Sequence, residues 1–535
     1  MFVKRQTRFG ECNLNVLEDI VKACSKEIKE EETNIKQIIL TLLSAWTNNP
    51  QNTRILAPSG EGKTYLVTKL AELFPQENIT ILAKATPQSF KYTFCSKKVI
   101  ENGTGNYQDY DIALKPLEEQ FEKTKDKETK KEIEKQIQEL RDSVYDLVDF
   151  TNKVIVLVDS QSFELFDSIK ATLSHDQENL KSFSVNKSKS GTILGQKFVI
   201  RGFPAVIYCS AKDEQKRDTT DEINTRFNTI SLNTSPKKYR KMLELEAIHS
   251  SLPDSIYQEE VISEKEVEEL KEKIKQIINY VKDFGKCCNP YGLGIQKLFR
   301  DDAGFRTRQF KILNNNITIH TLANAKFRPK IIHDEIKTPI TTRLDIEEAC
   351  KLTKEPREIQ PYKIKFFNDY IRCAILETGK EKHLIDVDFK CLTATELADY
   401  ITKKGRTADR QKLQESFLKP LVEHGFLDEF QDPDNRTRNI YTLAQGFLNN
   451  EASLESTLID TSMLNTSCLD SFVKKFIEQR YNSESLKILD ENDQEITPKE
   501  LLELLHKIDA QTPKITHKMG SIEASTSIDN FCDVS

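Results

Sequence analysis

The chain of 535 residues lacks the features that mark several protein classes. No apolar run approaches the roughly 18 residues of a membrane-spanning helix, and the N-terminal residues lack the apolar segment of a secretory signal peptide. Glycine and proline number only 17 each, which excludes collagen-like and low-complexity chains. We therefore expect a helix-rich globular protein that is soluble and cytoplasmic, with no membrane partner.

An excess of positive charge is also lacking. The 78 lysine and arginine residues stand against 84 aspartate and glutamate residues, which gives a net charge of −6. Without a global positive field, any contact with nucleic acid must be local. The 11 cysteines do not have the spacing of a metal site, so we expect reduced thiols and no disulfides.

A glycine-rich segment with the sequence Ala-Pro-Ser-Gly-Glu-Gly-Lys-Thr lies between a short apolar strand, residues 54–57, and an amphipathic helix. In this context backbone N–H groups and the helix N-terminus face phosphate oxygens. Lys63 would neutralise the β- and γ-phosphates, and Thr64 would bind Mg²⁺. A chance glycine-rich turn is the alternative, and Ala57 replaces the first glycine of the usual pattern. The predicted site for ATP and Mg²⁺ consists of Pro58, Ser59, Gly60, Glu61, Gly62, Lys63, Thr64 and Tyr65.

Hydrolysis also needs an acid near the Mg²⁺, and Asp159 directly follows the apolar strand 154–158. We expect Asp159 to face the phosphate loop across adjoining strands. The next position, which usually carries the glutamate that polarises water, is Ser160, and the nearest replacement carboxylates are Glu164 and Asp167. Ser210 ends another apolar strand and either senses the γ-phosphate or only caps the strand.

Two further segments have a recognisable pattern. Heptad spacing within an insertion, residues 107–149, predicts a helical hairpin or short coiled coil that either docks proteins or only acts as a solvated spacer. Two helices from residue 395 and a β-hairpin around residues 432–435 resemble a winged helix, which binds DNA or proteins. Its predicted DNA contacts are Lys403, Lys404, Arg406, Arg410, Arg436 and Arg438.

The order of motifs after Asp159 resembles that of AAA+ ATPases of the pre-sensor-1 hairpin branch, which includes minichromosome-maintenance-type helicases. A helix at 166–173, a hairpin at 184–191, a strand at 199–210 and the motif Asn-Thr-Arg-Phe-Asn at 224–228 follow in that order. The chain also looks like uncharacterised helicase-like ATPases of archaeal and mobile-element genomes. The resemblance spans residues 35–326, and the missing glutamate after Asp159 is its main departure.

This resemblance implies roles for four basic residues. Arg226 would reach the γ-phosphate bound by a neighbouring subunit of a homo-oligomeric ring, expected to be a hexamer; a local ion pair with Asp221 or Glu222 is the alternative. Arg308, or less favourably Arg306, would contact the nucleotide from a helical lid. Lys187 and Lys189 on the hairpin would contact DNA in the pore, unless they lie on an ordinary solvated loop.

The length implies two or three packed units. We expect an α/β P-loop NTPase of the AAA+ type with a parallel sheet, a helical lid and a coiled-coil insertion, then a winged-helix domain and a partly flexible tail. The expected boundaries are a helical lead-in at 1–50, the ATPase core at 51–245, the lid at 246–335, the winged-helix domain with its linker at 336–449 and the tail at 450–535.

The expected function is that of an ATP-dependent motor that remodels single- or double-stranded DNA, as a helicase or a replication initiator. Two alternatives remain open. The first is an ATP-dependent switch or transcription regulator that binds DNA through the winged helix. The second is a nucleotide-binding scaffold that does not hydrolyse ATP.

Overall fold

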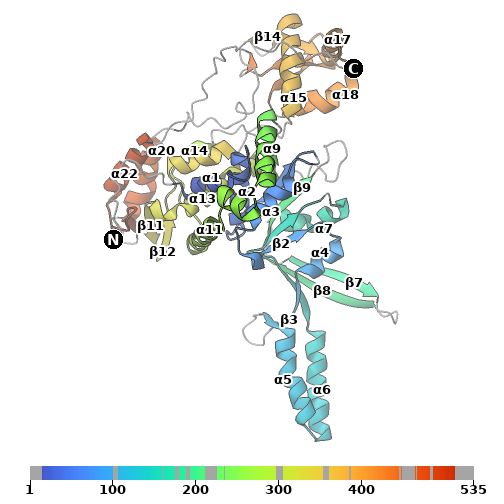
Figure 1. The fold of residues 1–535 in the computed structure, drawn as a ribbon, viewed down its shortest axis with the longest axis vertical. Coiled ribbons are helices and arrows are strands. Elements are labelled where there is room, and N and C mark those ends of the chain that lie inside the picture. Colours follow the sequence, from blue (N-terminus) through green and yellow to red (C-terminus); the bar gives the residue numbers. More distant parts are fainter. Residues whose placement is uncertain are drawn as a thin grey trace. The chain divides into compact units, whose positions relative to one another are not determined.

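The structure is a computed structural model, and its contacts divide the chain into two compact units (Figure 1). The first unit contains residues 1–290, 301–352 and 469–509, and the second contains 291–300, 353–468 and 510–535. The residues that the structure describes are 15–58, 60–100, 107–159, 161–174, 180–187, 193–210, 226–233, 235–296, 305–352, 361–384, 387–423, 425–444, 447–448, 464, 467–481 and 486–511.

A five-stranded parallel sheet forms the centre of the first unit. Its strand order is β10-β1-β9-β6-β2. β6 and β9 are buried along their whole length, as apolar strands covered on both faces must be. The parallel sheet expected from the sequence is therefore confirmed. The strands are β1 (Asn52–Leu56), β2 (Ile79–Leu82), β6 (Val154–Leu157), β9 (Ala205–Ser210) and β10 (Asn228–Ser231).

One expectation about this sheet is wrong. β9 lies between β1 and β6, so the strand that precedes Asp159 does not adjoin the strand that leads into the phosphate loop. The sequence could not reveal this, because β9 follows β6 by almost fifty residues and joins the sheet only through long-range pairing.

The N-terminal helices belong to the same hydrophobic core as this sheet. Every residue of α2 from Ile35 to Ser44 is buried, which places the helix inside the unit rather than on its surface. The core also takes in side chains of α11 and α13, for example Ile274 and Leu322. Apart from residues 291–300, the predicted lead-in, ATPase core and lid therefore lie in the first unit. The helices involved are α1 (Val16–Cys24), α2 (Glu32–Ser44), α3 (Lys63–Ala71), α11 (Glu264–Phe284) and α13 (Phe305–Ala323).

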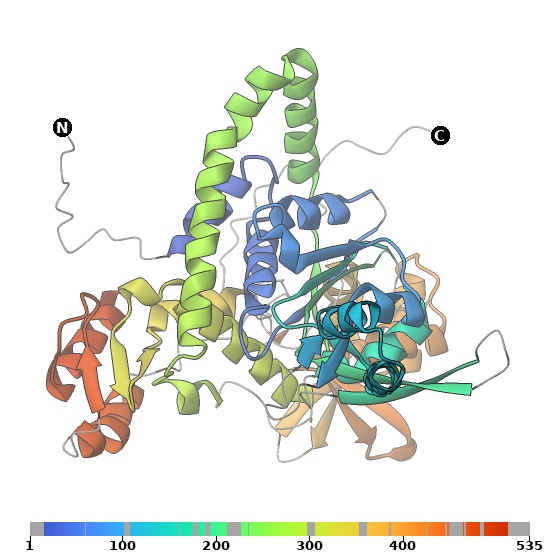
Figure 2. The same cartoon turned by 90° about the horizontal axis from the view of Figure 1, so that it is seen from below.

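The remaining helices near this sheet lie on its periphery. α4 (Pro87–Thr93) contacts α7 (Phe163–Ser174). α9 (Pro236–Ser251), α10 (Asp254–Val261) and α11 follow one another as an arch (Figure 2). Short helical segments of this unit occur at η1 (Gln76–Asn78) and η2 (Ala325–Phe327), whereas α12 (Gly292–Gln296) belongs to the second unit.

A second sheet, which the sequence did not predict, carries the insertion. Its order is β4-β3-β5-β8-β7, and β7 and β8 form a long antiparallel hairpin. Two contacting helices, α5 (Tyr110–Lys123) and α6 (Lys127–Asp142), lie between β4 and β5 and extend away from the sheet (Figure 1). The predicted helical hairpin is thus confirmed. The strands are β3 (Cys95–Ile100), β4 (Tyr107–Asp109), β5 (Tyr145–Asp149), β7 (Leu180–Lys187) and β8 (Ile193–Arg201).

The segment predicted as a tail contributes to the first unit. β17 (Leu486–Leu489) pairs with β11 (Lys330–His333), which also pairs with β12 (Ile336–Pro339). The predicted boundary at residue 450 is therefore wrong as the start of a tail, because residues 469–509 fold with the first unit. The helix expected at 498–508 is confirmed. The helical segments here are α14 (Arg343–Leu352), α20 (Ser467–Phe472), η8 (Val473–Ile477), α21 (Glu478–Tyr481) and α22 (Pro498–Gln511).

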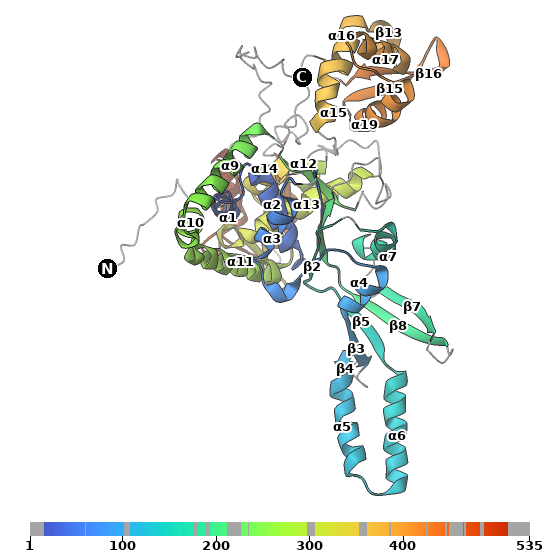
Figure 3. The ribbon, with the colours of Figure 1, turned by 45° about the vertical axis from the view of Figure 1, so that its right-hand side comes forward.

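The second unit contains the predicted pair of helices and the hairpin (Figure 3). They pack with a preceding helix and two strands that the sequence did not reveal, in a sheet of order β13-β14-β16-β15. Phe367, Leu397 and Phe426 are among the fully buried side chains of this separate core. The elements are α15 (Pro361–Phe366), η3 (Phe367–Arg372), α16 (Cys373–Thr378), β13 (Lys380–Leu384), β14 (Val387–Thr393), α17 (Ala394–Lys403), α18 (Arg410–Leu413), η4 (Gln414–Leu418), α19 (Lys419–Glu423), β15 (Leu427–Asp432) and β16 (Asn435–Leu443).

Buried charges join α14 to the rest of the first unit. Glu348 on α14 forms ion pairs with Lys36 on α2 and with Lys351, and the side chains of Glu348 and Lys36 are 8% and 9% exposed. Burial alone would raise the pKa of Glu348, but the charges and hydrogen bonds of these lysines outweigh burial and lower it from 4.5 to about 2.

We expect the free energy of unfolding to fall as the pH drops from about 4.5 to about 2. A carboxylate whose pKa is depressed in the folded state stabilises the fold above its unfolded pKa, and that contribution is lost as the pH falls through the folded pKa. The shift of Glu348 corresponds to a loss of up to about 3 kcal/mol. Denaturant titrations at about pH 6 and pH 3 would measure it.

Glu348→Gln should reduce this acid dependence, whereas Glu272→Gln, at an exposed position of α11, should leave it unchanged. An equal acid dependence in the parent and Glu348→Gln would contradict the role given to this ion pair.

Candidate functional site

The predicted phosphate loop connects the end of β1 to the start of α3. Gly60 and Gly62 have φ angles of +88° and +82°, in the left-handed region that strains any residue with a Cβ atom. No atom lies within 4 Å of a Cβ built on either glycine, so backbone conformation rather than crowding requires glycine here. The expected strand–loop–helix context is therefore present, with Ser59 outside the described residues.

Lys63 is the first residue of α3 and folds back over this loop. Its Nζ donates hydrogen bonds to the carbonyl oxygens of Ala57 (2.7 Å) and Pro58 (2.6 Å). The side chain is buried, and this burial lowers the pKa of its amine. An ammonium group has three N–H donors, so one remains for a further acceptor such as a phosphate oxygen.

The carboxyl ends of β9 and β6 place Ser210 and Asp159 at the same edge of the sheet as the phosphate loop. Ser210 is fully buried and pairs with Leu56, and its carbonyl oxygen accepts a hydrogen bond from the amide of Ala57 (3.3 Å). Asp159 is exposed just beyond the end of β6. The ends of neighbouring parallel strands are the usual place for ligands in open α/β sheets.

The buried thiol of Cys209 lies next to Ser210 at the end of β9 and is affected by the charges of Lys63 and Asp159. Burial raises its pKa to about 12, while the charge of Lys63 lowers it and that of Asp159 raises it. Both charges therefore act on the same strand end, one from each side. Although β9 separates β1 from β6, Lys63 and Asp159 follow the two strands that pair with β9, one on each side of it.

The carboxylates that could replace the missing glutamate lie on α7. Glu164, in the first turn, has its pKa lowered by hydrogen bonds from its own backbone amide and from the hydroxyl of Ser162. Its carboxylate is thus charged but engaged with its own helix. Asp167 is exposed on the same helix, and Ser160 lies outside the described residues.

Arg226 lies at the opposite edge of the sheet from the phosphate loop. Its carbonyl oxygen accepts a hydrogen bond from the side chain of Asn52 at the start of β1 (3.4 Å). The phosphate loop begins five residues further along β1, which corresponds to about 16 Å of extended chain. Arg226 is therefore on the wrong edge to act on its own phosphate loop. Its alternative partners, Asp221 and Glu222, lie outside the described residues.

Arg308 is exposed near the start of α13. About two turns later, Asn315 accepts a hydrogen bond from Asn49, and Asn316 accepts one from Gln51 (both 2.9 Å). The middle of α13 therefore contacts the segment that enters β1, at the edge away from the phosphate loop. The role of Arg308 as a nucleotide sensor stays a prediction, and the side chain of Arg306 is outside the described residues.

α9 makes contacts with the phosphate loop that no sequence pattern predicts. Tyr239 donates its hydroxyl hydrogen to Glu61 Oε1 (2.8 Å), and Lys238 Nζ donates to the Glu61 carbonyl oxygen (3.4 Å). Lys238 also forms an ion pair with Glu31 (2.7 Å), with side chains only 4% and 3% exposed. In the sequence these residues have the pattern of surface charges, and only tertiary packing distinguishes them.

We expect Lys238→Met to destabilise the first unit by about 3–5 kcal/mol, because the carboxylate of Glu31 would stay buried without its partner. Thermal or denaturant unfolding would measure the change. The neighbouring Lys237, whose side chain is 69% exposed and pairs with Glu30, offers a matched control. Lys237→Met should change stability by no more than about 0.5 kcal/mol, and equal effects of the two variants would contradict the importance of the buried pair.

The hairpin predicted to carry DNA-binding lysines is confirmed as β7 and β8. Lys187 is the last paired residue of β7, opposite Ile193. Lys189 lies outside the described residues, as does the rest of the turn, and the DNA contact of both lysines stays a prediction.

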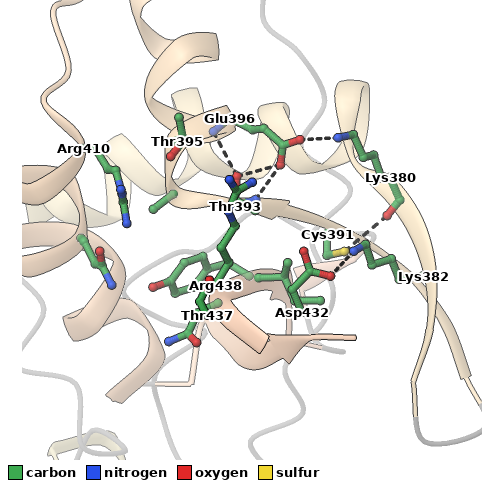
Figure 4. Close-up of a pocket in the computed structure, with 15 residues that line it drawn as sticks. Lys380, Lys382, Cys391, Thr393, Thr395, Glu396, Arg410, Asp432, Thr437 and Arg438 are labelled. Carbon is green, nitrogen blue, oxygen red and sulfur yellow. Dashed lines mark hydrogen bonds and ion pairs between the residues drawn. The ribbon is translucent and has the colours of Figure 1, made fainter. Parts of the chain in front are cut away.

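The basic residues of the second unit fall into two groups. Arg410, at the start of α18, and Arg438, on β16, line one cavity of about 350 Å³ (Figure 4). At the end of α17, Lys404 forms an ion pair with Glu377 (3.6 Å), and the guanidinium of Arg406 lies 4.9 Å from the ring centre of Phe366. Lys403 is exposed beside them, and the side chain of Arg436 is outside the described residues.

Comparison with known proteins identifies no family for this chain. No family model and no curated protein matches it. Among solved structures, a Drosophila ORC bound to DNA aligns at a TM-score of 0.22 and 12% identity, over 81% of this chain and 96% of that chain. The apo A form of the NrS-1 C-terminal region aligns at a TM-score of 0.20 and 11% identity, over 80% of this chain and 75% of that one. At TM-scores this low, neither likeness carries an argument about fold or function.

The described residues lack two further features. They contain no helix that is both long and apolar enough to cross a membrane. They also contain no group of three or more histidine, cysteine, aspartate or glutamate side chains placed to hold a metal ion.

Proposed function

We propose that this protein is an ATP-dependent DNA-remodelling motor of the AAA+ type, a helicase or replication initiator that works as a homo-oligomeric ring. The observation that carries the proposal is the division of groups between the two edges of the central sheet. Lys63, Ser210 and Asp159 gather at the carboxyl edge, while Arg226 lies at the amino edge.

The carboxyl edge suits binding and hydrolysis of ATP. The amides from Gly60 to Thr64 would hold the phosphates at the start of α3, and Lys63 would donate its remaining N–H to them. Thr64 and Asp159 would hold Mg²⁺, which offsets the charge that develops on the phosphates. Ser210 would orient the attacking water or the γ-phosphate.

The amino edge suits a contact with a second copy of the chain. Because about 16 Å of strand separate Arg226 from its own phosphate loop, its guanidinium can stabilise a transition state only in a neighbouring subunit. A ring provides this arrangement at every interface, since each interface joins two unlike surfaces.

Two structural features support DNA as the partner. The hairpin of β7 and β8 extends from the second sheet with Lys187 near its end. The second unit has two helices followed by a hairpin, the order of a winged helix, with Arg410 and Arg438 on those elements. A sequence-selective regulator would use the same unit without translocation.

One observation favours a different class, a nucleotide-binding scaffold without hydrolysis. Glu164 and Asp167 on α7 are the two candidates for the base that activates water. The carboxylate of Glu164 is hydrogen-bonded within its own helix turn. Binding of ATP without turnover would identify this scaffold. Turnover that DNA stimulates would identify a motor, and sequence-selective DNA binding without unwinding would identify a regulator.

We expect Lys63→Ala to lower ATP turnover by about 10²- to 10³-fold, because the group that meets developing phosphate charge is removed. Turnover with and without DNA and the affinity for a labelled ATP analogue would be measured together. Lys69→Ala, on the same helix but paired with Glu27 (3.2 Å), is the control and should retain turnover. Full turnover in Lys63→Ala would exclude the phosphate loop as the catalytic site.

We expect Arg226→Ala to lose turnover alone and to regain part of it when mixed with Lys63→Ala. In a mixed ring, an intact Lys63 of one variant can meet an intact Arg226 of the other at about a quarter of the interfaces. Turnover of each variant and of the equimolar mixture, after subunit exchange, measures this. No recovery in a mixture shown to form joint rings would contradict action across an interface.

A further inference from the structure

A cavity of about 350 Å³ lies wholly within the second unit. β13, β14, β16, the end of β15 and the starts of α17, α18 and η4 supply its walls (Figure 4). Four cationic side chains line it against two carboxylates, those of Glu396 and Asp432. The lining therefore has a positive balance, although the whole chain is acidic.

The two lysines of the lining are committed to the two carboxylates. Lys380 forms an ion pair with Glu396, which also closes the capping box at the start of α17. Lys382 is bound to Asp432 and to Asp434 (2.9 Å), and hydrogen bonds to these carboxylates raise its pKa. These pairs stabilise the wall of the cavity. The net positive charge of the lining therefore comes from the two arginines.

Arg410 and Arg438 have the opposite character. Both are exposed, and neither forms an ion pair or a side-chain hydrogen bond with any residue that the structure describes. They reach the cavity from different elements, α18 and β16 (Figure 4). Two guanidinium groups whose N–H donors form no hydrogen bond to the described residues suit an oxyanion that accepts several hydrogen bonds, and phosphate is the common one.

We propose that this cavity holds one nucleotide of a single nucleic-acid strand, with its phosphate between Arg410 and Arg438. The volume is near the lower end of small-ligand pockets, so it fits one nucleotide and not a duplex. Thr395, Gln414 and Asn439 add polar groups to the lining for the sugar and base. The proposal rests on the proposed function only in taking nucleic acid as the partner.

Fluorescence anisotropy with a labelled single-stranded DNA tests this on the full chain. Arg410→Gln/Arg438→Gln should weaken binding about tenfold or more at about 0.15 M salt, and should reduce the slope of log affinity against log salt by about 0.7, as expected for one lost phosphate contact. Lys365→Gln/Lys412→Gln removes the same charge from exposed positions outside the cavity and should change binding less than threefold or so.

Several results would overturn the proposal. These are unchanged binding of the single strand by the arginine variant, an equal loss in the lysine control, and displacement of the strand by free dAMP at equal concentration. A loss confined to a duplex of the same sequence would also overturn it. Thermal unfolding of each variant checks the fold, and Arg410→Lys/Arg438→Lys, which keeps charge but lacks the planar fork, should bind with intermediate affinity.

The same assays distinguish failure of this proposal from failure of the proposed function. Turnover of ATP by the unaltered protein without DNA reports on the phosphate loop alone. If that turnover is present and the arginine variant binds the strand normally, only the cavity proposal fails. If turnover is absent while the arginine variant loses the strand, the motor fails and the cavity proposal stands.

Discussion

The position of β9 between β1 and β6 is the constraint on which the candidate site depends. Neighbouring strands lie about 4.8 Å apart, so the phosphate loop and Asp159 are roughly 10 Å apart across the carboxyl edge. That gap is wide enough for a phosphate with its metal and too wide for direct contact between the phosphate loop and Asp159. The end of β9 lies between them and places Ser210 against the loop, so any ligand held by both flanks must lie over this strand.

The local features could be predicted from the sequence because local chemistry determines them. Glycines at 60 and 62, followed by a lysine and an apolar periodicity, specify a turn into a helix, and heptad spacing specifies the helical insertion. The features that the sequence did not predict depend on contacts between residues far apart in the chain. The strand order, the second sheet and the pairing of Lys238 with Glu31 follow from packing, which a pattern of a few residues cannot express.

The same limit applies to the site residues. The sequence placed Arg410 and Arg438 on a helix and a hairpin, but their convergence on one cavity depends on β13 and β14, which the sequence did not reveal. Conversely, Lys404 and Arg406 matched the predicted basic pattern, yet they are engaged with Glu377 and with aromatic rings. Charge pattern alone does not separate basic residues with partners from those available to a ligand.

The pairing of β17 with β11 has a consequence for the order in which the chain can fold. The sheet that contains residues 330–333 is complete only when residues 486–489 have been synthesised and have paired with them. Most of the second unit, 353–468, lies between these two strands in the chain. During synthesis that intervening unit leaves the ribosome first and can build its own core, since domains fold as units. The segment 353–468 is therefore joined to the first unit at both of its ends.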